Sequence, residues 1–192
     1  MMEHARNQVR RSEPNPYATR EDFIKVFHEN MNGLYQLSFL LTGNHGKAEK
    51  CFVAGIENCV KENSVFREWA RSWAKRTIIQ NAIHELGPRP SHSTSSPSAG
   101  VPSYTQQLNG SGEQFEADAV LGLGDFERFV FVMSVLERYS QHDCALLLGC
   151  SISEVREARV RALEDLAGAR QVVFFTPANS QIHDGGEAGK PS

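Results

Sequence analysis

The sequence predicts an all-α protein of two small helical domains joined by a flexible linker. Apolar residues recur at helical spacing from Glu21 to Leu86 and again from about Val120 to Gln171. Between these segments lies a polar run rich in Pro, Gly and Ser, which cannot bury enough apolar surface to offset its ordering entropy. We therefore expect a helical domain over 20–86, a disordered linker over 87–118, a second helical domain over 119–171 and a disordered tail over 172–192.

Three amphipathic helices are expected in the first domain. One apolar stripe runs from Phe23 to Leu41 and stops at Thr42-Gly43-Asn44-His45-Gly46. A second stripe runs from Ala48 to Val60, and a third runs from Phe66 to Leu86. Short turns between amphipathic helices favour a compact helical domain.

The second domain should contain a helix-turn-helix. After a helix through Phe126 and Leu136, a short apolar helix ends at Gly149, the residue type that most easily adopts the left-handed conformation of a helix C-terminus. Ser151 or Ser153 can then cap a second helix. This is the pattern of a motif whose second helix lies in the major groove of DNA.

The composition is that of a globular protein, with 40% hydrophobic and 22% charged residues in a chain of 192. No apolar run approaches the roughly 20 residues that span a bilayer, so we expect a cytoplasmic protein without membrane contact. The formal net charge of -3 argues against a protein that coats DNA unaided. It leaves room for a local basic surface that binds DNA.

The cysteines and the missing catalytic motifs argue against metal, cofactor and enzyme chemistry. Cys51, Cys59, Cys144 and Cys150 form no Cys-x-x-Cys pair, and we expect them to be small buried hydrophobic residues. The alternative is a redox or metal switch at Cys51 and Cys59. The sequence contains no Gly-rich phosphate loop and no Gly-x-Ser-x-Gly, so no catalytic residues are assigned.

Candidate DNA-binding residues lie in and just before the second helix of the motif. Three arginines supply positive charge for phosphates or guanine edges, and two serines lie where the helix N-terminus favours a phosphate. Two glutamates could accept from a cytosine amino group. The set is Ser151, Ser153, Glu154, Arg156, Glu157, Arg159 and Arg161.

Motifs in both segments match, in order, those of one family. The first segment holds Leu40-Leu41-Thr42-Gly43-Asn44, Lys47-Ala48-Glu49, Phe66-x-x-Trp69-x-x-x-Trp73, Asn81 and Glu85. The second holds Glu127-Arg128, Ser140-x-x-Asp143-Cys144-Ala145-x-x-Leu148-Gly149-Cys150-Ser151, Glu154-Val155-Arg156, Arg161-Ala162 and Leu166. Together they resemble a bacterial RNA polymerase sigma factor of the extracytoplasmic-function type, a small member of the sigma-70 family.

The resemblance implies binding partners and a different role for each domain. The first domain would dock on core RNA polymerase through a surface that includes Glu49, Lys50, Val53 and Glu57. It would hold the melted promoter strand with Trp69, Arg71, Trp73, Lys75, Arg76 and Asn81, the tryptophans being core residues in the competing interpretation. The second domain would read promoter DNA, and an anti-sigma protein is a further expected partner.

The chain also departs from the family pattern at named positions. Lys50, Val53 and Ala54 replace an acidic residue and a Gln-Glu pair on the polymerase-facing surface. Glu157 and Ala158 replace a frequent Ser-Arg pair in the recognition helix. The alternative function is therefore a sigma-like helix-turn-helix regulator or decoy that does not activate core polymerase.

Overall fold

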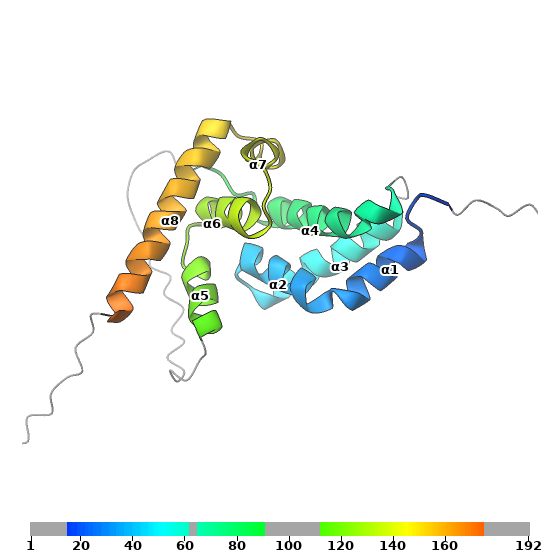
Figure 1. The fold of residues 1–192 in the computed structure, drawn as a ribbon, viewed down its shortest axis with the longest axis horizontal. Helices are drawn as coiled ribbons and strands as arrows, with labels where there is room; N and C mark the ends of the chain where they lie inside the picture. The colour runs from blue at the N-terminus through cyan, green and yellow to red at the C-terminus, as the bar shows by residue number, and fades with distance from the viewer. Residues whose placement is uncertain (1–14, 62–64, 91–111, 175–192) are drawn as a thin grey trace, which may run out of the picture.

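A computed structural model describes residues 15–61, 65–90 and 112–174 (Figure 1). The described residues are all-α, as the sequence predicts, and contain no strand beyond an isolated bridge between Tyr17 and Phe66. None of their helices is long and apolar enough to cross a bilayer. The elements in chain order are α1(Arg20–Glu29), α2(Met31–Thr42), α3(His45–Lys61), η1(Arg67–Trp69), α4(Ala70–Leu86), α5(Gly112–Leu121), α6(Asp125–Phe131), η2(Val132–Leu136), α7(Gln141–Leu148) and α8(Ile152–Phe174).

The first predicted helix is two helices, because the chain leaves the helical conformation at Asn30. That residue has φ -116° and ψ 20°, and both its main-chain N–H and its side-chain Nδ2 donate to the carbonyl of Val26. The side chain thus bonds to the preceding turn of α1, where it shares the same carbonyl with the main-chain N–H. The apolar stripe continues across the break because Phe23 and Phe27 of α1 and Leu34 of α2 are all buried.

Helices α1 to α4 pack around one another as a four-helix unit (Figure 1). The closest approach is between α3 and α4, where Gly55 faces Ile78. A Cβ atom at position 55 would lie 3.0 Å from Cγ1 of Ile78, so the glycine permits this separation. The third predicted helix is preceded by the 3-10 turn η1, which carries Trp69.

The second half begins earlier and ends later than the sequence predicts. Helix α5 starts at Gly112, inside the predicted linker of 87–118, and α8 runs to Phe174, inside the predicted tail of 172–192. The remainder of the predicted linker from 91 to 111 and of the tail from 175 lies outside the described residues. The helix expected through Phe126 and Leu136 is present as α6 and the π-helical turn η2.

The two halves are packed together at α2. This helix contacts α5, α6 and η2 of the second half, and the buried side chains of both halves form one continuous apolar cluster. Arg128 of α6 is 6% exposed and donates through Nε to the carbonyl of Leu41 at 3.3 Å. The second half also approaches α4, and residues of both line a groove.

Candidate nucleic-acid interface

The helix-turn-helix forms at α7 and α8, as the sequence predicts. Ser140 caps α7 by accepting from the main-chain N–H of Asp143. Gly149 ends α7 in the left-handed conformation with φ 65°, and its N–H donates to the carbonyl of Ala145. Because L residues rarely adopt a positive φ, glycine at this position sets the angle at which the chain enters α8.

Ser151, rather than Ser153, caps α8. Its hydroxyl accepts from the N–H of Glu154, and the Glu154 carboxylate accepts in return from the N–H of Ser151 at 2.7 Å. This reciprocal pair is a capping box, which satisfies two amides that a helix N-terminus otherwise leaves unpaired. Two predicted DNA-binding residues, Ser151 and Glu154, therefore also determine where α8 begins.

The outer face of α8 carries Ser153, Arg156, Glu157 and Val160, which are all exposed. The inner face carries Val155, Ala158 and Ala162, each 0% exposed. Ala158 is therefore a packing residue. Leu163 is 45% exposed because it lies on the same helical face as Arg156 and Val160.

The three predicted arginines of α8 have different surroundings. Arg156 is exposed, whereas Arg159 is half-buried. Arg161 donates through Nε and Nη2 to Oε1 of Glu127, at 3.1 and 2.9 Å. Because Glu127 is buried, this two-point contact fastens α8 to α6. Arg156 is thus the arginine of the set that is directed to solvent.

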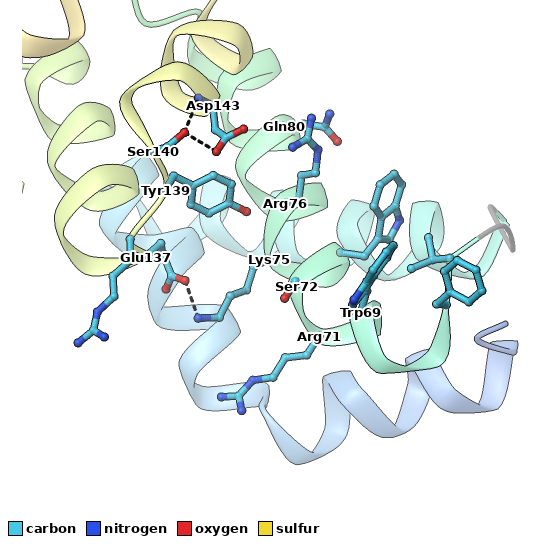
Figure 2. Close-up of a pocket in the computed structure, with 14 residues that line it drawn as sticks. Trp69, Arg71, Ser72, Lys75, Arg76, Gln80, Glu137, Tyr139, Ser140 and Asp143 are labelled. Atoms are coloured by element: carbon cyan, nitrogen blue, oxygen red, sulfur yellow. Dashed lines mark hydrogen bonds and ion pairs between the residues drawn. The ribbon is translucent and has the colours of Figure 1, made fainter. Parts of the chain in front are cut away.

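A second candidate surface is a groove of about 970 Å³ along α4 (Figure 2). It brings together five of the residues predicted to hold a melted strand: Trp69, Arg71, Trp73, Lys75 and Arg76. Trp69 is 57% exposed, so it is not a core residue, whereas Trp73 is half-buried against the core. Exposed aromatic faces beside basic side chains are the combination that binds single-stranded nucleic acid.

Trp69 belongs to a small cluster of exposed aromatic rings. Its ring packs edge-on against Phe66 at 5.3 Å between centroids, and Phe66 stacks on Tyr17 at 5.0 Å. Tyr17, Phe66 and Trp69 are all more than a third exposed. The cluster extends the aromatic surface beyond the groove toward α1.

Asn81 does not join the groove. Its Nδ2 donates to the carbonyl of Thr77 at 2.9 Å, and its Oδ1 accepts from Asn58 of α3 at 3.4 Å. These contacts place it between α3 and α4, away from Trp69 and Lys75. A polar side chain bonded to the preceding helical turn accounts for the asparagine at this position.

The opposite wall of the groove comes from the segment between η2 and α7 and from the first turn of α7, which sequence reasoning did not assign to this site. It contributes Glu137, Arg138, Tyr139, Ser140 and Asp143. Glu137 and Tyr139 point toward α4 (Figure 2), and the carboxylate of Glu137 accepts from Nζ of Lys75 at 2.5 Å. No periodicity links positions 62 residues apart, so only the tertiary packing reveals this wall.

The pKa of Tyr139 depends on charged residues that line the same groove. Burial raises the pKa of the Tyr139 hydroxyl, while the positive charge of Arg76 acts in the opposite direction. Glu137 and Asp143 are among the acidic groups that reinforce the rise. The groove therefore has a basic wall on α4 and a partly acidic wall on the second half.

The predicted polymerase-docking residues share one face of α3. Glu49, Lys50, Val53 and Glu57 line a shallow depression with Gly46 and Ala54. Lys50 donates to Glu85 of α4 at 2.6 Å, and this contact raises the pKa of the lysine and lowers that of the glutamate. Val53 is 46% exposed, so this face presents an apolar centre within a charged rim.

The four cysteines are free thiols, three of them buried and Cys150 half-buried. Burial raises the pKa of Cys51 and Cys150, and it raises the pKa of Cys144 to about 11. A raised pKa disfavours the reactive thiolate. These thiols therefore have the burial and protonation expected of small hydrophobic side chains.

Comparison with known proteins finds a structural similarity at low sequence identity. No family model matches this chain, and no curated protein matches it. Among solved structures, the chain is similar to one in the co-crystal structure of the sigma factor RpoE in complex with the anti-sigma factor NepR from Bartonella quintana. The identity is 17% and the TM-score 0.44, over 79% of this chain and 98% of that chain.

Proposed function

We propose that this protein is a sigma factor, which directs core RNA polymerase to promoters and helps to initiate transcription. Support comes from the ordered motifs of the sequence and from the geometry of α7 and α8. The observation that carries the proposal is a helix-turn-helix whose second helix has Ser153, Arg156 and Glu157 exposed on its outer face. In such motifs the N-terminal part of the second helix contacts base edges in the major groove.

Duplex recognition would depend chiefly on Arg156. Its guanidinium offers paired donors to the acceptors of a guanine edge or to a phosphate. Ser151 and Ser153 lie at the start of α8, where the helix dipole favours a phosphate. Arg159 and Arg161 would add positive potential near the backbone.

The opened strand would lie along α4. Bases would stack on Trp69 and on the exposed part of Trp73, while Arg71 and Arg76 would neutralise phosphates. The face of α3 that carries Glu49, Lys50, Val53 and Glu57 would bind core polymerase. Polymerase then supplies the frame that positions both DNA-binding surfaces, so the affinity of the isolated protein for DNA should be low.

Co-elution with core RNA polymerase on gel filtration, followed by promoter-directed transcription, tests the proposal. We expect a stable complex and specific transcripts, which Arg156→Ala should reduce by about tenfold or more, as expected for loss of one bidentate base contact. Lys25→Ala, which removes an exposed lysine of α1, is the matched control and should leave transcription unchanged. A folded protein that fails to bind polymerase would overturn the proposal.

The second candidate is a sigma-like regulator or decoy that does not activate polymerase. The face of α3 favours it, because Lys50 is paired with Glu85 and Val53 is an exposed apolar centre. That surface would suit another protein, such as an anti-sigma protein. Binding to duplex DNA as a dimer in the absence of polymerase would distinguish a free-standing regulator.

A further inference from the structure

The groove along α4 contains an internal competitor for nucleic acid. Lys75 is one of its basic residues, yet its ammonium is bound to the carboxylate of Glu137 at 2.5 Å (Figure 2). The side chain of Glu137 is 15% exposed and that of Lys75 is 32% exposed. The acid thus lies inside the groove rather than on its rim.

Glu137 lies in the short turn that connects η2 to α7. The π-helical turn η2 ends at Leu136, and the N–H of Glu137 donates to the carbonyl of Val132. Arg138 follows with φ 59°, the positive-φ conformation that side-chain-bearing residues rarely adopt. Glu137 points toward α4 (Figure 2), and Ser140 caps the start of α7. Strained residues such as Arg138 tend to persist where the local geometry has a function.

The wall that carries Glu137 and Asp143 has negative charge, as a nucleic-acid phosphate bound to the basic wall of α4 would have. Glu137 and Asp143 approach from the second half, opposite Arg71, Lys75 and Arg76 of α4. A carboxylate and a phosphate oxygen compete for the same ammonium group, because both accept charge-assisted hydrogen bonds from it. Glu137 therefore occupies the position at Lys75 that a backbone phosphate would take.

One polar contact between the halves is made by Arg128. Arg128 donates to Leu41 of the first half, but its remaining acceptors are Leu121, Leu123 and Asp125 of its own half. If the halves separate, this buried guanidinium loses a hydrogen bond of 3.3 Å and keeps the others. Loss of this contact therefore leaves no unpaired buried charge, which would be costly. Separation also exposes part of the apolar cluster that the two halves share.

We propose that Glu137 masks the nucleic-acid groove of α4, so that single-stranded DNA binds there only when the second half moves away from Lys75. The inference rests on the proposed role of α4 in holding a melted strand. The masked state is the one with the Lys75–Glu137 ion pair, and the open state exposes the ammonium to phosphate.

Binding of a fluorescein-labelled oligothymidine of about 12 nucleotides, a typical single-strand site size, tests the mask by anisotropy at low salt. Glu137→Gln should tighten binding about fivefold, the scale of one partly exposed ion pair. Glu29→Gln is the matched control, since it removes the same charge from an exposed ion pair on α1, and its affinity should match the parent protein. In a Glu137→Gln background, Lys75→Ala should abolish the gain.

Several outcomes decide the inference. Equal affinities for the parent and Glu137→Gln, or an equal gain in Glu29→Gln, would overturn it. Glu137→Asp, which keeps the charge but shortens the side chain, should show a smaller gain and replaces the first variant if that one unfolds. If Glu137→Gln binds the oligonucleotide more tightly but no variant directs transcription with core polymerase, the mask stands and the sigma function fails.

Discussion

Arg128 and Leu41 lie 87 residues apart, yet the guanidinium Nε of the first donates to the main-chain carbonyl of the second. Leu41 belongs to the last turn of α2, where carbonyl groups lack partners within the helix and carry the negative end of its dipole. A buried arginine at this point donates a hydrogen bond to such a carbonyl and places a positive charge at the negative end of the dipole. The contact joins the α1–α4 unit to the half that carries the helix-turn-helix.

We predict that Arg128→Met lowers the free energy of unfolding by about 3 kcal/mol. The substitution leaves the carbonyls of Leu41 and Leu123 without a donor and strips Asp125 of its partner. Urea unfolding followed by circular dichroism measures the change. Arg156→Met is the control, because an exposed arginine should change stability by at most about 0.5 kcal/mol. Equal midpoints for the two variants would show that the Arg128 contacts contribute little.

We predict that Gly149→Ala destabilises the protein by about 1 kcal/mol. A Cβ atom at this position meets nothing within 4 Å, so the cost comes from the backbone, which has φ 65°. Thermal unfolding compares it with Gly168→Ala, where the glycine lies inside α8 and also has open space. That control should be stabilised by about 0.5–1 kcal/mol, since alanine favours a helix interior. A loss of stability of the same size in both variants would contradict this explanation.

We predict that substitution of Arg156 weakens DNA binding, whereas substitution of Arg161 lowers the stability of the fold. Arg156→Ala should weaken promoter binding by the polymerase complex at least about tenfold without changing the unfolding midpoint. Arg161→Ala should lower the free energy of unfolding by about 2 kcal/mol, because it leaves the buried carboxylate of Glu127 unpaired. A double-mutant cycle with Glu127→Gln measures the coupling between the two side chains. Equal losses of stability in the two arginine variants would contradict the assignment.

The helices and the turn of the recognition motif follow from local chemistry, which is why the sequence predicts them. Gly149 and Ser151 act through their own backbone and that of their near neighbours, so their roles can be inferred from residue type and position. The break at Asn30 could not be inferred, because the apolar periodicity runs through it from Phe27 to Leu34.

Only the α4 wall of the candidate groove could be predicted from the sequence. Trp69, Trp73 and Arg76 recur at helical spacing on one predicted helix, so their proximity is expected. Glu137 and Tyr139 reach the groove through the packing of one half on the other, which leaves no local trace in the sequence. Arg161 was assigned to DNA because positive charge in a recognition helix suggests it, whereas the competing carboxylate of Glu127 lies on another helix.

The final prediction concerns alkaline pH and the buried thiol of Cys144. Burial raises its pKa from 9.0 to about 11, so between these values the native state keeps a proton that the unfolded chain releases. Stability therefore falls as pH rises across this window, by about 2 kcal/mol in total. Urea unfolding from pH 8 to 11 should show a shallower decline in Cys144→Ala than in the parent. Any lower stability that this variant shows at pH 8 reflects lost packing, so the slope alone is compared. Identical slopes would mean that the thiol titrates alike in both states.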